Sequence, residues 1–127
     1  VVEEVLRFRS TASSFGRLAL EDVRLSGDVI PAGTTVKASI WSANRDAAEF
    51  PYPNQFAVDD NRVGVQVAFG QGAHHCLGAA LARAELQESL IALAGRMRCP
   101  RLEPGAEHLP PLGLSGPTKL PIAFEPR

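Results

Sequence analysis

The chain has 127 residues, a hydrophobic fraction of 45% and a formal net charge of −1, a composition typical of one globular domain. A charge so close to zero gives no support for nucleic-acid binding or for a general membrane-surface role, and we expect neither partner. No apolar run approaches the ~20 residues that span a bilayer, and no targeting segment opens the sequence, so a cytoplasmic location is expected.

The first eight residues predict a helix, because Val1, Val2, Val5, Leu6 and Phe8 place apolar side chains along one broad face. Charged residues interrupt this face. Since the sequence begins without methionine and inside this helical pattern, we expect a fragment of a longer protein.

The next forty residues predict loops and short strands. Residues 10–16 are small and polar around one aromatic residue, which indicates a loop. Short apolar pieces between residues 18 and 40, divided by Gly27 and the turn at 31–33, predict a small antiparallel sheet. Residues 44–50 then predict a short helix that is capped by Ser42 or Asn44 and ended by prolines.

A long irregular segment is predicted over residues 51–76, and loops of that length inside compact domains are usually functional. A helix is predicted from Leu77 to about Arg98, and its two apolar stripes imply contacts on two sides. Pro100 would stop this helix. The tail is rich in proline and glycine and ends in a predicted strand over 120–124.

Cys76 is the centre of the predicted function. A glycine-rich run delivers this residue to the start of the long helix, where unpaired N–H groups and the helix dipole favour an ionised, metal-ligating thiolate. Gly70 and Gly72 can adopt backbone angles closed to other residues, and they let a flat ligand approach the main chain. His74 lies two residues before the sulfur and could reach an anionic edge of the same ligand.

Other readings of this loop fit less well. A dinucleotide-binding turn needs a glycine at the position of His75, and the phosphate-loop pattern is absent. A zinc site made of His74, His75 and Cys76 is disfavoured because adjacent ligands do not easily converge on one ion. Cys99 could pair with Cys76 by count alone, but without a secretory signal we expect a small buried or half-buried residue without chemistry.

The run FGQGAHHCLG over residues 69–78 resembles the haem-binding signature of the cytochrome P450 family. The resemblance implies haem b as cofactor and Cys76 as the proximal iron ligand. It also implies that Phe69 packs near the sulfur and that His74 contacts a haem propionate. By the same resemblance, three glycines shape the loop and let the next helix lie against the porphyrin: Gly70, Gly72 and Gly78.

Further motifs extend the resemblance beyond the cysteine loop. Glu4 and Arg7 resemble the Glu-x-x-Arg pair of the family, although such a pair read alone is usually a weak surface contact. The family adds an arginine from the meander before the haem loop. The matching stretch here is residues 50–56, in which Gln55 stands where that arginine is often found. A neutral amide cannot supply the bidentate charge of a guanidinium. Arg17 matches a family arginine that reaches a haem propionate, and residues 43–46 match a tract that we treat as structural.

Substrate and partner contacts can also be placed by resemblance. Two segments would face the cavity above the haem, and their candidate contact residues are Ser14, Phe15, Gly16, Pro117 and Thr118, beside Gly116. Arg62 and Arg83 flank the cysteine loop and its helix. They are candidates to meet an acidic ferredoxin, although exposed arginines are more often solvated.

The order of motifs resembles the C-terminal third of a bacterial, soluble cytochrome P450. The expected fold class is an α+β fragment of this mainly α fold, with a small antiparallel sheet, an irregular meander and a cysteine-ligand loop followed by one long helix. Residues 1–127 would form a single partial domain that cannot enclose a haem alone. The oxygen-activating acid-alcohol pair of the family would precede Val1, so the isolated fragment is expected to be inactive.

The resemblance implies a haem-thiolate monooxygenase. Such an enzyme inserts one oxygen atom from dioxygen into a small organic substrate, with electrons from NAD(P)H delivered by a reductase and a ferredoxin. An alternative is a noncatalytic haem-binding or recruitment protein, which Gln55 slightly favours. A weaker alternative is a small zinc-dependent module.

Overall fold

The computed structural model of the chain describes residues 1–58, 65–108 and 114–127. The helices are α1 (Val2–Phe8), α2 (Ile40–Ala43) and α3 (Ala79–Arg96), with a 3-10 turn η1 (Gly72–His74) between the last two. The strands are β1 (Ser14–Leu18), β2 (Val23–Leu25), β3 (Asp28–Ile30), β4 (Thr35–Ser39), β5 (Met97–Leu102), β6 (Glu107–His108), β7 (Pro117–Lys119) and β8 (Ile122–Pro126). No helix in these ranges is both long and apolar enough to cross a membrane.

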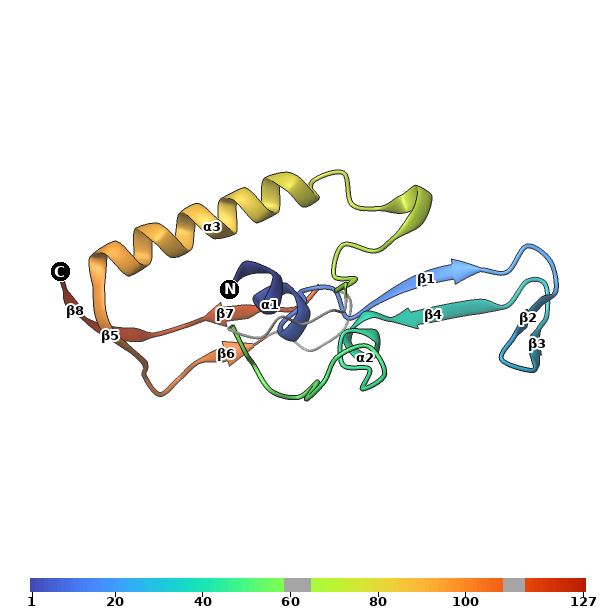
Figure 1. Ribbon diagram of the computed structural model, residues 1–127, viewed down its shortest axis with the longest axis horizontal. Coiled ribbons are helices and arrows are strands. Elements are labelled where there is room, and N and C mark those ends of the chain that lie inside the picture. Colours follow the sequence, from blue (N-terminus) through green and yellow to red (C-terminus); the bar gives the residue numbers. More distant parts are fainter. Residues whose placement is uncertain (59–64, 109–113) are drawn as a thin grey trace.

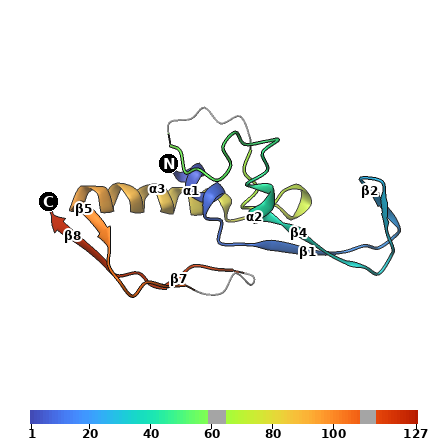
Figure 2. The same ribbon diagram turned by 90° about the horizontal axis from the view of Figure 1, so that it is seen from below.

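The described strands form antiparallel pairs: β1 with β4, β2 with β3, β5 with β8 and β6 with β7. The β1–β4 ribbon runs away from α1 and α2 and carries the β2–β3 hairpin at one end of an elongated molecule (Figures 1 and 2). At the other end, β5 and β8 lie beside the C-terminal end of α3. The predicted α+β class is confirmed, as separate two-stranded pairs instead of one small sheet.

The buried part of the described chain is small and unusually polar. Its hydrophobic members are Ala12, Ala19, Ile40, Phe50, Ala68 and Ala79, and its polar members are Glu4, Arg7, Ser10 and Asn44. Along α3, by contrast, Leu81 is 63% exposed and Ile91 58% exposed. The contacts predicted on two sides of this helix are therefore incomplete, because described segments cover little of its apolar surface.

The predicted helix over residues 44–50 is wrong. The helix lies earlier, as α2, because the Ser39 hydroxyl caps it by accepting a hydrogen bond from Ser42 N at 3.2 Å. Asn44 is the last, capping residue of this helix and not its first. The following residues form turns, in which the Asp46 carbonyl accepts from Phe50 N at 2.9 Å.

Three predicted boundaries also shift. The loop over 10–16 ends early because β1 begins at Ser14 and pairs with β4. The long helix ends at Arg96, since Met97 is already extended and pairs with Pro126. The last strand runs to Pro126 because it follows this pairing, and not over 120–124 as predicted.

Cys99 is exposed, so the prediction of a buried or half-buried side chain is wrong. The residue lies on β5 where the pairing with β8 is irregular between Arg98 and Arg101. Its φ of 47° places it in the left-handed region, which is typical of a bulge.

Candidate functional site

The cysteine loop turns back on itself so that Cys76 lies beside Phe69. Cys76 N donates to the Phe69 carbonyl at 3.0 Å. Positive φ angles at Gly70 (70°) and Gly72 (76°) make the turn possible, as their predicted conformational role required. The ring nitrogen Nδ1 of His75 lies 3.0 Å from the Gly70 carbonyl and closes the loop.

The thiol of Cys76 is free and exposed at the end of this loop. The sequence predicts a position at the start of the helix, and the structure places Cys76 just ahead of it, since α3 begins at Ala79 and Gly78 precedes its first turn. An ideal Cβ on Gly78 would lie 3.9 Å from the Cys76 sulfur. Glycine at position 78 therefore leaves the space next to the Cys76 sulfur free of a side chain.

Gly70 packs closely against β1. An ideal Cβ on Gly70 would lie 3.4 Å from Cε2 of the Phe15 ring, and the positive φ already disfavours a side chain. Phe15 comes from the strand that pairs with β4, opposite Ala38. The β1–β4 ribbon therefore packs against the cysteine loop through Phe15.

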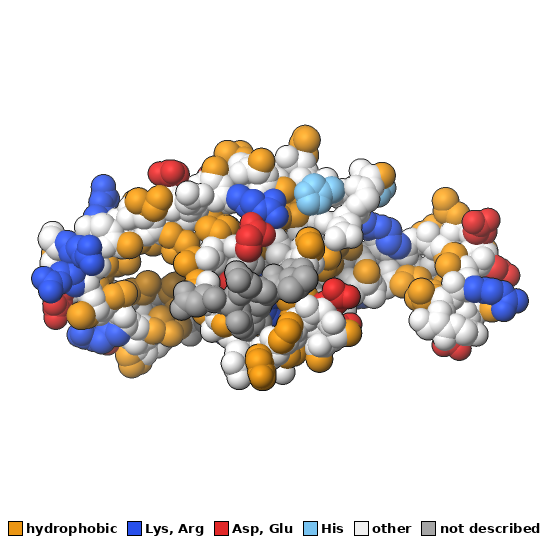
Figure 3. Space-filling view, in the orientation of Figure 1, with side chains coloured by type: hydrophobic (Ala, Val, Ile, Leu, Met, Phe, Trp, Pro, Cys, Tyr) orange, Lys and Arg blue, Asp and Glu red, His pale blue; other side chains and the backbone are white. Residues whose placement is uncertain are grey.

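A hollow of about 300 Å³ lies between these two elements. Phe15 and Arg17 of β1 line one side, and Gly70 and His74 of the loop line the other. Figure 3 shows histidine side chains at the surface in this region, between the start of α3 and β1. The structure thus brings together Arg17 and His74, which the sequence predicted separately as contacts for one anionic ligand.

The predicted Glu4–Arg7 pair forms and is buried, unlike the surface pairs that a Glu and an Arg three apart on a helix usually make. Two parallel hydrogen bonds join Arg7 Nε and Nη2 to the two carboxylate oxygens of Glu4, each at 2.7 Å. The side chains are 2% and 8% exposed for Arg7 and Glu4 respectively. They are buried because the meander wraps around them, and Ala57 N donates to Glu4 Oε1 at 3.0 Å.

Backbone carbonyls complete the shell of Arg7. Its Nη1 donates to the carbonyls of Asn44 and Pro53, both at 2.8 Å, and its Nη2 donates to the Gln55 carbonyl at 2.9 Å. Gln55 therefore joins the cluster through its main chain. The Asn44 side chain extends the cluster, because its Oδ1 accepts from Val67 N at 2.8 Å, just ahead of the cysteine loop.

The five residues predicted to contact substrate lie on two strands instead of two loops. Ser14, Phe15 and Gly16 belong to β1, and Pro117 and Thr118 belong to β7. The two segments meet near their starts, where Ser115 N donates to the Thr11 carbonyl at 2.7 Å. Of the five residues, Phe15 lines the hollow in the described part of the chain.

A second network, which the sequence did not predict, joins α1 to the start of α3. The Glu3 carboxylate accepts from Arg83 Nε at 2.6 Å and from Gln66 Nε2 at 2.8 Å. The hydrogen bond from Arg83 is the main cause that lowers the pKa of Glu3, and the same bond raises the pKa of Arg83. The sequence feature that could have indicated this network is the pair of adjacent glutamates, Glu3 and Glu4. Arg62, the other arginine named for a partner, lies outside the described residues.

Within residues 1–58, 65–108 and 114–127, no three His, Cys, Asp or Glu side chains come together to hold a metal ion. Both cysteines are free.

The family model for Cytochrome P450 matches residues 1–96 of the chain. The chain belongs to the cytochrome P450 family. It is 40% identical to luteothin monooxygenase of Streptomyces thioluteus over 97% of the chain and 30% of that protein. It is 41% identical to mycinamicin IV hydroxylase/epoxidase of Micromonospora griseorubida over 97% of the chain and 32% of that protein.

Solved cytochrome P450 structures share this fold. The structure of CYP109E1 from Bacillus megaterium in complex with testosterone matches with a TM-score of 0.88 and 38% sequence identity, covering 94% of the chain and 34% of that protein. The chain thus spans about a third of the length of the cytochrome P450 proteins that it matches.

Cytochrome P450 membership implies a haem cofactor, and the residues present fit one. The exposed thiol of Cys76 would be a suitable ligand for iron, and Gly72, with nothing within 4 Å of an ideal Cβ, leaves open space beside it in the loop. Arg17 and His74 line one hollow and offer nitrogen donors to carboxylates.

Proposed function

We propose that this chain is the proximal, haem-holding part of a cytochrome P450 monooxygenase, with Cys76 as the iron ligand of haem b. The observation that carries the proposal is the shared hollow of Arg17, Gly70 and His74 beside the loop that presents a free, exposed Cys76. Sequence and geometry support the same ligand, because Arg17 and His74 offer propionates a donor from each side of the hollow, and the adjoining loop offers iron a free thiol.

Each residue has a distinct part in binding. The Cys76 thiolate holds the iron, and the Phe69 carbonyl holds the Cys76 N–H at 3.0 Å. Arg17 and His74 donate hydrogen bonds to the propionates, where a charged donor gives stronger bonds than a neutral one. Gly70, Gly72 and Gly78 keep side chains away from the ring.

When bound, a thiolate-ligated haem supplies the chemistry that cleaves the oxygen-oxygen bond. The proposed overall reaction takes one dioxygen, two electrons and two protons, places one oxygen atom in the substrate and releases the other as water. NAD(P)H supplies the electrons through a reductase and a ferredoxin. In this chain, the Glu4–Arg7 cluster would hold the meander in place behind the cysteine loop.

The proposed substrate is a small organic molecule. The relatives support this class, since luteothin monooxygenase and mycinamicin IV hydroxylase/epoxidase are named for such molecules and the CYP109E1 structure contains testosterone. Phe15 lines the hollow that is assigned above to the haem, and it stays a prediction for a substrate contact. Ser14, Gly16, Pro117 and Thr118 stay predictions for the same role.

The test uses the complete protein that carries this chain, reduced under carbon monoxide. The expected result is the red-shifted Soret band of a thiolate-ligated haem. Cys76→Ser should abolish that band, whereas Cys99→Ser should leave it intact, since Cys99 is on β5. Equal loss in both variants, or no such band in the wild type, would contradict the assignment.

The noncatalytic alternative rested on Gln55, and the geometry gives it little support. Arg7 uses the Gln55 carbonyl, so an arginine side chain at this position is not needed to complete its hydrogen bonds. A monooxygenase is therefore the function that we retain.

A further inference from the structure

The network around Glu3 connects three segments that are far apart in the sequence. Glu3 lies on α1, Gln66 lies ahead of the cysteine loop, and Arg83 lies on the second turn of α3. Arg83 makes a forked contact, with Nε 2.6 Å from Glu3 Oε1 and Nη2 3.3 Å from Glu3 Oε2. Two contacts on one carboxylate fix the plane of the guanidinium as well as its position.

Gln66 also binds the Glu3 carboxylate, and it connects this carboxylate to the cysteine loop. Its Nε2 donates to Glu3 Oε2 at 2.8 Å, while its Oε1 accepts from Ala68 N at 2.7 Å. Ala68 is buried and precedes Phe69 directly. The side chain of Gln66 therefore ties the carboxylate of α1 to the backbone that leads into the cysteine loop.

Arg83 in turn contacts the loop through an aromatic ring. Its guanidinium carbon lies 4.9 Å from the centre of the Phe69 ring, within the range of a cation–π contact. The carbonyl of the same Phe69 accepts the hydrogen bond from Cys76 N at 3.0 Å. One residue thus carries both the ring that Arg83 covers and the backbone group that positions Cys76.

We propose that Arg83 is a positioning residue for Cys76, held in place by Glu3 and Gln66 and acting through Phe69. This inference rests on the proposed function, in which Cys76 is the iron ligand. An exposed ion pair contributes little to global stability, and the side chains are 39% and 58% exposed for Arg83 and Glu3. Its effect is therefore local, on the orientation of Phe69 and of the cysteine loop.

The position of Arg83 also argues against a simple docking role. An arginine that meets a partner ferredoxin needs its guanidinium free to turn outward, whereas this one is held by Glu3 and by the Phe69 ring. It also approaches the Ala79 carbonyl within its own helix, at 3.5 Å.

The first test measures Cys76 directly, in the complete protein with Cys99 replaced by serine. Without haem, the rate at which a thiol reagent alkylates Cys76 reports how firmly the loop is held. Arg83→Gln should raise this rate about two- to fivefold, the size expected for a weak exposed contact. With haem, the reduced carbon monoxide complex of Arg83→Gln should show a larger fraction without the thiolate band.

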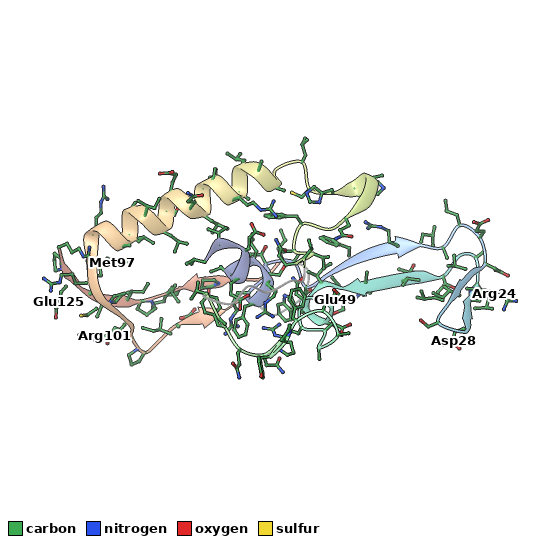
Figure 4. All side chains as sticks on the ribbon, in the orientation of Figure 1. Arg24, Asp28, Glu49, Met97, Arg101 and Glu125 are labelled. Carbon is green, nitrogen blue, oxygen red and sulfur yellow. The ribbon has the colours of Figure 1, made fainter. Side chains whose placement is uncertain are left out.

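The matched control is Arg101→Gln. Arg101 also pairs with a glutamate in an exposed ion pair, Glu103 at 3.2 Å, but it lies on β5 at the far end of the molecule (Figure 4). This variant should change neither measurement. If Arg83→Gln matches the control in both, the proposal is overturned. If Arg83→Gln does not yield folded protein, Glu3→Gln replaces it, with the same direction expected.

A charge exchange separates positioning from a plain ion pair. The double variant Glu3→Arg with Arg83→Glu can restore an ion pair between α1 and α3, but it removes the cation over Phe69. We expect it to keep the raised alkylation rate, and a return to the wild-type rate would overturn the role of Phe69. Absence of the thiolate band in the wild type would instead refute the proposed function, while the alkylation rates would still test Arg83.

Discussion

Arg7 is the residue on which most of the described core depends. It is 2% exposed, it pairs with Glu4 at 2.7 Å, and its guanidinium carbon lies 5.3 Å from the centre of the Phe50 ring. It donates five hydrogen bonds to four residues, which is the full donor capacity of a guanidinium. One side chain therefore fixes α1, the end of α2 and the meander relative to one another.

Replacing Arg7 should destabilise the complete protein strongly. Arg7→Ala removes the guanidinium that balances the buried Glu4 carboxylate, and breaking a buried ion pair in this way costs about 3–5 kcal/mol. Arg7→Lys keeps the charge but loses the two parallel hydrogen bonds to Glu4, so it should lower the free energy of unfolding by less than Arg7→Ala does. Chemical denaturation measures both free energies of unfolding. Arg24→Ala on the exposed β2–β3 hairpin (Figure 4) is the control, and an equal loss there would contradict the prediction.

The sequence predicts the conformation of the cysteine loop better than it predicts which side chains are buried. Spacing alone identifies the cysteine loop, because glycine positions and one cysteine are local features. The burial of Glu4 and Arg7 depends on a segment about fifty residues away, which no local pattern contains. The same holds for Glu3 and Arg83, whose pairing across 80 residues follows from tertiary packing.

At the scale of elements, the cysteine loop depends on the conformation of Gly70. An alanine there must adopt a φ of 70°, and its Cβ would meet the Phe15 ring at 3.4 Å. We expect Gly70→Ala to lower stability by about 1 kcal/mol and to weaken haem binding. Gly95→Ala on α3 is the control, for which we expect a gain in stability instead of a loss. Its Cβ meets nothing within 4 Å, so it should stabilise the helix by about 0.5–1 kcal/mol.

Thermal unfolding and haem titration of the complete protein measure both glycine variants. A Gly70→Ala variant with wild-type stability and haem affinity would show that the loop does not need this backbone conformation. Failure of Gly95→Ala to stabilise would indicate that α3 is covered at this position in the complete protein.

The link between α1 and α3 should depend on pH. Since Arg83 lowers the pKa of Glu3 in the folded state, the stabilisation is complete above the ordinary glutamate pKa and is lost as pH falls through the lowered value. The difference in unfolding free energy between wild type and Glu3→Gln should therefore shrink on acidification. Repeating the comparison with Arg83→Gln in both proteins should weaken this pH dependence, because the hydrogen bond from Gln66 still lowers the pKa of Glu3. A difference that grows toward low pH would contradict the assignment.

The boundaries of elements were the least predictable part of the fold. The sequence predicted a helix after Ser42, but the hydroxyl of Ser39 caps an earlier one. At the other end, pairing of Met97 with Pro126 ends α3 two residues before the predicted limit. In both cases a specific contact decides between conformations that the local sequence allows equally.

At the scale of the whole molecule, the described chain covers little of its own apolar surface. Four of its six buried hydrophobic residues are alanines, which contribute little burial energy. Large side chains remain exposed along α3 and the terminal strands, among them Leu93 at 48% and Phe124 at 47%. Figure 3 shows this apolar surface spread over the length of α3. Such exposure is typical of surface that other parts of a protein cover.

The 127-residue chain produced alone should therefore behave differently from the complete protein. Without a substantial core it should bind the dye ANS strongly and unfold without a sharp cooperative transition, because marginal stability requires more apolar burial than the described residues provide. The complete protein should bind little dye and unfold cooperatively. Dye fluorescence and calorimetry on both proteins decide the question. A sharp transition with weak dye binding in the short chain would show that these residues form an independent folding unit.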